Sequence, residues 1–381
     1  MSKRQKLSFL PIEGLPDEII LKIFSLLDIK GVFQCGQVSK RLQAISNDQS
    51  LWSKLNLFGK EVPFGFIEKA VQNGCEYLNL RCSSVNGIKM KNVQWKLKYL
   101  DISQNEWVNR LSSHLFIPAM VLGNCRFLEK LAMDNLTLKT HNIEQICQNG
   151  ETLRILSLGQ CTLPMTYHRA EWIERLFIRC HQLTEVNFSI SRNALHDSNV
   201  HSDVYALVDN LTPNILKLDL AYQNFVNDKH VNTLVQRCNK ITELNLSDTS
   251  ITNGSVKSIV NHLNSLENLS VCCTNIDFST LLQLKSVPTL KVLHCLQDQQ
   301  DLQDTEEIKN LKMQLPHINI NPSDDYFHIA TSRKKEDLDL AMDISNDLAD
   351  WFWEIRANQH DLFPKAHDMF PGYSRRLLKN C

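Results

Sequence analysis

Leu244-Asn245-Leu246-Ser247-Asp248 is one copy of a short element that recurs along the chain and decides its fold. Apolar residues at alternate positions, with polar residues between them, are the pattern of a β-strand with one buried face. Successive copies start 22 to 32 residues apart, a period typical of solenoid proteins. The first residues of the ten copies are Leu78, Leu100, Leu131, Leu156, Val186, Leu218, Leu244, Leu269, Leu293 and Ile318.

The intervals between these copies carry apolar residues at positions i, i+3, i+4 and i+7, which predicts a helix with one buried face. Alternating strands and helices predict parallel strands joined by right-handed crossovers. Because strands stack about 4.8 Å apart and packed helices need about 8–10 Å, the sheet must line the inside of a curve. Two of the helical stripes are Ile173, Leu176, Phe177, Cys180 and Val231, Leu234, Val235, Cys238.

The residues between the paired apolar positions are polar, so the concave face of the sheet is expected to be open and polar. A second regular position lies three residues after the second apolar residue of a copy, where Cys161, Thr249 and Thr274 stand. These small side chains suit a hydrogen bond to the backbone of the turn. The polar residues within the strands are Asn79, Asp101, Ser157, Asn187, Asp219, Asn245 and Ser270.

A different pattern precedes the repeats. Leu15-Pro16-Asp17-Glu18 predicts the start of a helix, since Pro suits the first helical turn and acidic residues favour a helix N-terminus. The apolar positions that follow are too many for a unit of about 45 residues to bury alone. We therefore expect this module to complete its core against a partner.

This beginning, together with Ile23-Phe24-Ser25, Val38-Ser39-Lys40-Arg41 and Leu51-Trp52, resembles an F-box at its usual spacing. The alternative is an unrelated helical hairpin. The resemblance implies that the module docks on the Skp-type adaptor of a cullin-based ubiquitin ligase. The residues expected at that contact are Leu15, Pro16, Ile19, Ile23, Phe24, Leu26, Val38, Leu42 and Trp52.

An F-box followed by so many repeats resembles the leucine-rich-repeat class of F-box proteins. Residues 286–293 and 315–321 are similar to the last two repeats of one member of that class, and the chain departs from that member at Ser189-Ile190. Asp248 matches a position that, in that member, touches a small cyclin-dependent-kinase-binding adaptor, which implies such a partner here. The resemblance also implies a C-terminal tail that folds across the concave face; the alternative is a cap on the last repeat.

The predicted fold is α/β, with a small all-helical domain in front of a horseshoe. Residues 1–14 are expected to form a disordered tail, 15–58 the F-box, 59–321 a right-handed leucine-rich-repeat solenoid of about ten repeats, and 322–381 the tail or cap. A target protein is expected on the concave face, where alternate strand side chains point. The residues expected to bind it are Arg81, Asp101, Asp219, Tyr222, Asn245, Asp248, Trp351 and Trp353.

Composition excludes several other classes. Lys plus Arg is 41 and Asp plus Glu is 42, so the chain lacks the excess of positive charge that would suggest binding to nucleic acid. It also lacks a run of about 18 apolar residues, which a membrane-spanning helix would need. No Cys-x-x-Cys pair or glycine-rich phosphate loop is present, so we expect no metal, no cofactor and no catalytic residue. The 12 cysteines, without an export signal, favour reduced thiols in the nucleus and cytoplasm.

Two functions fit these expectations. In the first, the chain is the substrate-recognition subunit of a ubiquitin ligase made of a Skp adaptor, a cullin and an F-box protein. A role in cell-cycle control is expected for such a ligase, and its target is either phosphorylated or unmodified. In the second, it is a non-ligase scaffold whose repeats bind a protein partner. A catalytic role comes third, because no catalytic constellation is present.

Overall fold

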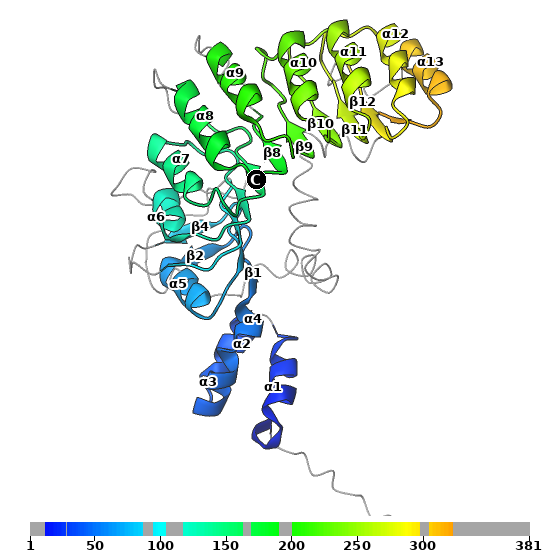
Figure 1. Cartoon of the computed structure of the whole chain (residues 1–381). Helices are drawn as coiled ribbons and strands as arrows, with labels where there is room; N and C mark the ends of the chain where they lie inside the picture. The colour runs from blue at the N-terminus through cyan, green and yellow to red at the C-terminus, as the bar shows by residue number, and fades with distance from the viewer. Residues whose placement is uncertain are drawn as a thin grey trace, which may run out of the picture.

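The computed structural model describes residues 12–27, 29–86, 94–103, 117–162, 169–189, 200–297 and 305–322. A small group of helices at the N-terminal end leads into an arc whose strands line the inside and whose helices form the outer wall (Figure 1). The predicted α/β class and the horseshoe are confirmed.

One parallel sheet runs through the whole arc, and its strands follow one another in chain order. Neighbouring strands align residue for residue, so Leu131, Leu156, Val186 and Leu218 stack in one row. The strands are β1 (Lys54–Asn56), β3 (Tyr77–Asn79), β5 (Tyr99–Asp101), β6 (Lys130–Ala132), β7 (Ile155–Ser157), β8 (Glu185–Asn187), β9 (Lys217–Asp219), β10 (Glu243–Asn245), β11 (Asn268–Ser270), β12 (Val292–His294) and β13 (Asn319–Ile320).

The sheet has 11 strands in the described residues, one more than the ten predicted copies. The additional strand is β1, which lies within the range 15–58 assigned to the F-box and pairs with β3. Its Leu55-Asn56-Leu57 is itself a copy of the strand pattern. A separate two-stranded sheet joins β2 (Glu61–Pro63) to β4 (Ser84–Asn86). The last turns of the F-box therefore run directly into the first repeat.

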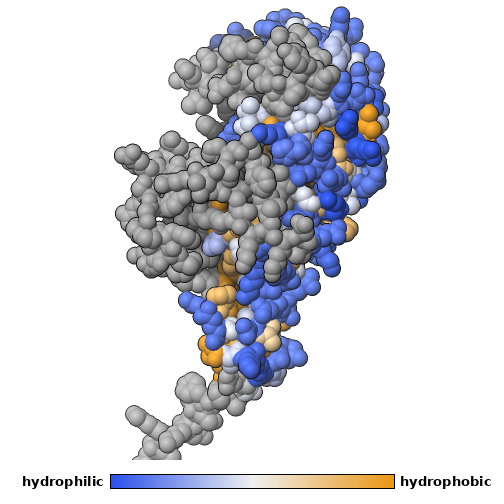
Figure 2. Space-filling model, turned by 90° about the vertical axis from the view of Figure 1, so that its left-hand side faces the viewer, coloured by the Kyte–Doolittle hydropathy of each residue, from blue (hydrophilic) through white to orange (hydrophobic). Residues whose placement is uncertain are grey.

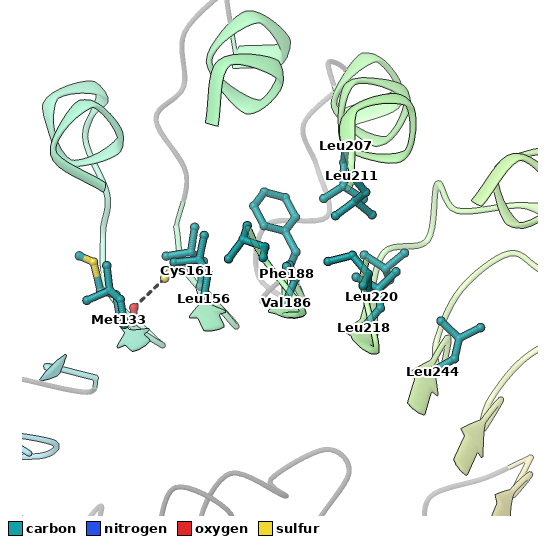
Figure 3. Packing of buried hydrophobic residues seen from close by; sticks show 14 of the residues in the cluster. Met133, Leu156, Cys161, Val186, Phe188, Leu207, Leu211, Leu218, Leu220 and Leu244 are labelled. Atoms are coloured by element: carbon teal, nitrogen blue, oxygen red, sulfur yellow. Dashed lines mark hydrogen bonds between the residues drawn. The ribbon is translucent and has the colours of Figure 1, made fainter. Parts of the chain in front are cut away.

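The helices of the repeats pack their apolar stripes against the backs of the strands. Phe177 from a helix meets Phe188 from the turn after β8 edge to face, with ring centres 5.9 Å apart. Both residues belong to one continuous core, and Figure 3 shows the part of it around Phe188. These helices are α5 (Phe64–Gln72), α6 (Ile117–Asn124), α7 (Thr140–Cys147), α8 (Arg169–Arg179), α9 (Val200–Asn210), α10 (Asp228–Arg237), α11 (Asn253–His262), α12 (Phe278–Leu281) with the 3-10 helix η3 (Leu282–Ser286), and α13 (Glu306–Gln314).

The two threonines after the strands bond to the backbone of their own turns as predicted, whereas the bond of Cys161 goes to the backbone of a neighbouring repeat. Thr249 donates to the carbonyl of Leu246 at 2.6 Å, and Thr274 donates to Val271 at 2.7 Å. The thiol of Cys161 donates to the carbonyl of Met133 in the neighbouring repeat at 2.9 Å (Figure 3).

The concave face differs from the expected open polar surface. Apart from the half-buried Asp219, the polar residues predicted within the strands are buried. Most of these side chains also make a local hydrogen bond: the side-chain oxygen at the end of a strand accepts from the backbone N–H two residues later, as in an Asx turn. This bond measures 2.8 to 3.1 Å and recurs at Asn56, Asn79, Asp101, Asn187, Asp219 and Asn245.

The turn after each of several strands contains one residue with left-handed backbone. It lies two positions after the second apolar residue, and its N–H donates to a carbonyl of the following repeat; that of Tyr222, for example, donates to Ser247 at 2.9 Å. Gly59 adopts this conformation at no steric cost and Asn or Asp tolerates it, whereas it is unfavourable for the other residue types found here. The others at this position are Cys82, Asn135, Gln160, Tyr222, Asp248 and Cys273.

Asp228 joins two neighbouring repeats through their helix N-termini. It begins α10, and its Oδ1 accepts from the N–H of Thr252 at 2.8 Å and from the hydroxyl of Ser255 at 2.5 Å, both at the start of α11. Burial raises the pKa of Asp228, but these hydrogen bonds outweigh burial and lower the pKa overall. The charged form therefore stabilises the folded state.

We expect Asp228→Ala to lower the free energy of unfolding by about 1–3 kcal/mol, because the buried Ser255 and the exposed Thr252 at the start of α11 lose their acceptor. Urea denaturation of the variant and of Asp277→Ala measures this. Asp277 is exposed and its Oδ2 accepts from Asn253 at 2.6 Å across the next pair of repeats, so its loss should cost less. Equal effects of the two substitutions would contradict the bracing role of Asp228.

Candidate protein-binding surfaces

The F-box residues form a helical domain with a core of its own. It contains α1 (Asp17–Phe24), α2 (Ile29–Gly36), α3 (Lys40–Ser46) and α4 (Gln49–Trp52), after the short 3-10 helix η1 (Ile12–Gly14). The core cluster is separate from that of the solenoid. Its buried members are Ile20, Phe24, Val32, Leu42 and Ile45.

The sequence motifs of this domain hold its helices together. Ser39 caps α3 by accepting from the N–H of Leu42 at 3.3 Å. Arg41, two residues later, donates to Asp17 at 2.9 Å through Nε and to the carbonyl of Leu15 at 2.6 Å through Nη2. Arg41 thus fixes the start of α1 against α3, which explains why the first and third motifs occur together.

Several apolar side chains of this domain face outward, and apolar residues gather at this lower end of the molecule in Figure 2. Leu26, in the turn after α1, is 81% exposed, and Val38, in the turn after α2, is 73% exposed. Both were predicted at the adaptor contact, as was the exposed Ile19; Pro16 is also exposed, and Leu15 and Ile23 are half-buried. The exposed Ile12, Leu27 and Phe33 were not included in that prediction.

Three of the predicted adaptor residues are buried within the chain, which corrects the expectation that they contact the adaptor directly. Phe24 and Leu42 fill the core of the F-box. Trp52 belongs to the solenoid core, where its Nε1 donates to the carbonyl of Ser46 at 2.6 Å and its ring lies 6.0 Å from that of Phe66 in α5. These residues can influence the adaptor surface only by supporting it.

Phe33 lies at the junction of the two domains. Lys69 of α5 places its ammonium group 4.6 Å from the centre of the Phe33 ring and 5.7 Å from that of Trp52. Such cation–π contacts add to apolar packing. The junction therefore connects the F-box to the first helix of the solenoid through aromatic side chains.

The residues predicted to bind a target fall into two groups. In the first group, Arg81, Asp101 and Asn245 are buried and Asp219 is half-buried. The side chains of Asp101, Asp219 and Asn245 each accept a hydrogen bond from the backbone N–H two residues later. These acceptors have a structural role that the sequence did not indicate.

Tyr222 and Asp248 form the second group, and the structure places them at equivalent positions of adjacent repeats. Both are half-buried, both follow strands that pair with each other, and both have left-handed backbone, with φ of 64° and 55°. Cys273 occupies the same position after β11. We call Tyr222, Asp248 and Cys273 the strand-end row. The recurring left-handed turn therefore holds one side chain of each of these repeats at the strand end.

Asp101 has an unusual environment. Its side chain is fully buried, and its Oδ2 has no hydrogen-bond partner while Oδ1 accepts from Ser103. Burial raises the pKa of Asp101 to about 6, the charge of Asp134 contributes to the rise, and Arg81 and Ser103 oppose it. This carboxyl group is therefore largely protonated below pH 6.

Trp351 and Trp353, predicted to bind a target, lie outside the described residues. Within the described ranges, no group of three or more His, Cys, Asp or Glu residues is arranged to hold a metal ion. Among the helices of those same ranges, none is long and apolar enough to cross a lipid bilayer.

Comparison with known proteins agrees with this arrangement. Residues 12–57 match the model of the F-box-like domain, and residues 65–342 match that of the SKP2 LRR domain. The F-box protein dre-1 of Caenorhabditis elegans is 41% identical over 54 residues, which are 14% of this chain and 6% of that protein. The chain thus spans only a small fraction of this curated relative.

The solved structure of leiomodin-1 actin-binding site 2 overlaps 46% of this chain and 98% of its own, at 17% identity and a TM-score of 0.28, which is too low to support a conclusion. The member of the class whose last repeats resemble residues 286–293 and 315–321 is S-phase kinase-associated protein two, and the family match confirms that resemblance. Because the matching model covers more than half of its length, the chain belongs to the SKP2 LRR domain family and carries an F-box-like domain in front of the repeats.

Proposed function

We propose that this chain is the substrate-recognition subunit of a ubiquitin ligase built from a Skp-type adaptor, a cullin and an F-box protein. The observation that carries the proposal is the F-box domain itself, which has a closed core yet leaves Leu26 and Val38 almost fully exposed. Exposed apolar side chains grouped on one small domain are typical of a protein-binding surface. F-box domains in general bind Skp adaptors.

In this proposal the chain contributes position and no chemistry. The F-box holds the ligase machinery and the horseshoe holds the target, so a target lysine stays near the charged ubiquitin carrier at a high effective concentration. A small cyclin-dependent-kinase-binding adaptor beside Asp248, a phosphorylated target, a role in the cell cycle and a location in nucleus and cytoplasm are finer parts of the same proposal. They rest on the resemblance to S-phase kinase-associated protein two.

Co-purification of the full-length chain from cells tests the proposal against the scaffold alternative. A ligase subunit brings down a Skp-type adaptor in stoichiometric amount, and a cullin with it. Recovery of a target protein without any Skp-type adaptor would favour the scaffold.

We further propose that the strand-end row contacts the target, with Tyr222 as the anchor and Asp248 attracting a basic surface. Tyr222→Gly combined with Asp248→Asn should lower target affinity at least about tenfold, since an aromatic anchor and a charge are lost. Binding of the purified target to the adaptor-bound chain measures this. Gly and Asn both tolerate left-handed backbone, so the fold should be preserved.

Asn135→Gly is the matched control, because Asn135 has the same turn position and a φ of 58° in an earlier repeat. This control should leave the target affinity unchanged. If the double variant binds the target as tightly as the control does, the recognition surface lies elsewhere on the horseshoe.

A further inference from the structure

Cys147 and Cys180 meet at the C-terminal ends of two neighbouring helices. Cys147 is the last residue of α7, and Cys180 directly follows Arg179, the last residue of α8. Cys180 is fully buried, whereas Cys147 is half-buried at the edge of the same core. Cys147 is therefore the more accessible residue of the pair.

Gly150 allows this close approach. A Cβ atom at Gly150 would lie 2.4 Å from the carbonyl oxygen of Arg179 and 3.2 Å from that of Cys147, so any side chain there would push the two helix ends apart. Gly150 stands five residues before its strand, as Cys125, Cys180 and Cys238 do before theirs. The missing side chain in this one repeat lets Cys180 reach across to Cys147.

The surroundings favour a reactive thiolate at Cys147. The hydrogen bond from Cys180 lowers the pKa of Cys147 in spite of its partial burial; Arg175 and Arg179 add to this effect, and Glu144 opposes it. Cys180 responds in the opposite direction, because the same hydrogen bond and burial raise its pKa. In contrast, burial raises the pKa of Cys75, Cys125 and Cys295 to about 12. A thiolate beside cationic groups is the form that reacts with oxidants.

We propose that Cys147 and Cys180 form an oxidant-responsive dithiol that hydroperoxides convert to a disulfide. The Cys147 thiolate attacks the peroxide O–O bond, becomes a sulfenic acid and releases water or an alcohol. The Cys180 sulfur then attacks the sulfenic sulfur and displaces its hydroxyl group as a second water molecule. Two thiols are oxidised and one peroxide is reduced, and an external dithiol reverses the change by exchange.

The disulfide would tie α7 to α8 on the convex side of the sheet, away from the F-box and the strand-end row. It would add a covalent link between two repeats whose strands β7 and β8 already pair in the sheet. This modification site is independent of the proposed ligase role, and its test does not require a target or a ligase assay.

The experiment exposes the reduced full-length chain, with any co-purified adaptor, to stoichiometric hydrogen peroxide, blocks free thiols and maps the peptides by mass spectrometry. We expect a Cys147–Cys180 linked peptide, lighter by two hydrogens than its reduced parts, that disappears on treatment with dithiothreitol. In Cys180→Ser the expected product is a sulfenic acid at Cys147, trapped by dimedone. In Cys147→Ser the peroxide should leave Cys180 unmodified.

Cys238→Ser is the matched control, because Cys238 is equally buried at the equivalent position of a later repeat. The linked peptide should form in this variant as in the unaltered chain. Two results would each overturn the proposal. In the first, the blocking reagent alkylates Cys147 as completely after peroxide treatment as before it, so Cys147 has stayed reduced. In the second, Cys147 is oxidised no faster than Cys35. Both are measured on the unaltered chain, so a variant that fails to fold does not affect them.

Discussion

Leu26→Asp combined with Val38→Asp should abolish capture of the Skp-type adaptor while the horseshoe remains folded. Both side chains are exposed in the free chain, so an acidic residue at either position leaves the F-box core intact. In a complex each Asp would have to be buried against an apolar surface, which we expect to cost at least about 2 kcal/mol. Together the two substitutions should lower the affinity about 1000-fold. A binding assay between purified chain and adaptor measures the change.

Met313→Asp is the matched control, because Met313 is 75% exposed on α13 at the other end of the solenoid. It should bind the adaptor normally. Phe24→Ala gives a useful contrast: it should lose adaptor binding through unfolding of the F-box, since truncating a buried Phe costs about 3–5 kcal/mol. If the Leu26 and Val38 double variant retains full adaptor capture, the exposed apolar residues are not the docking surface.

Asp101→Asn should make the chain more stable at neutral and alkaline pH. The folded state holds this carboxyl group at a pKa of about 6, well above its ordinary value of 3.8, because the ionised form is desolvated. A raised folded-state pKa means that the group favours folding when it is protonated. Its contribution is therefore full only at pH values well below about 4, declines as the pH rises to 6, and is lost above that value. The total change corresponds to about 3 kcal/mol.

An asparagine keeps the oxygen that accepts from Ser103 at 2.8 Å but carries no charge. The stability gained by the variant relative to the unaltered chain should therefore grow by about 2 kcal/mol between pH 4 and pH 7.5, since part of the total change lies below pH 4. Urea denaturation at several pH values provides the measurement. A difference between the two proteins that stays constant over this range would contradict the buried, raised pKa of Asp101.

Asp228→Asn gives the opposite dependence and serves as a comparison. The pKa of Asp228 is lowered in the folded state by its hydrogen bonds to Ser255 and Thr252, against the effect of burial. Its contribution to stability is present above the unfolded pKa and is lost as the pH falls through the folded one. Removing this charge should therefore matter most at neutral pH and least in acid.

The repeated strand pattern was sufficient to predict ten strands of the sheet from sequence, because stacking identical units constrains the fold strongly. β1 was missed because Leu55-Asn56-Leu57 directly follows Leu51-Trp52 and was assigned to the F-box with it. Periodicity shows which side chains alternate, but it does not show that Asn79 or Asn245 turns back to its own backbone.

The adaptor surface was predicted less completely for a different reason. Ile19 and Ile20 are adjacent apolar residues in a short helix, and only the packing of α1 against α3 decides that Ile20 is buried and Ile19 exposed. The left-handed turns were hidden because residues such as Tyr222 occupy positions where glycine would have been a signal. The meeting of Cys147 and Cys180 depends on the approach of two repeats at Gly150, which no single-repeat pattern contains.

Because the parallel strands are evenly spaced, the number of strands between two positions gives their separation along the sheet. β9 lies six strand spacings from β1, or about 29 Å along the inner arc at about 4.8 Å per strand. A binding side chain placed one repeat further along would move a bound protein by about 5 Å relative to the F-box. In the proposed ligase, the choice of repeat therefore determines which lysine of the target comes within reach of the ubiquitin carrier. Insertion or loss of one repeat would change the modified lysine while leaving both binding contacts intact.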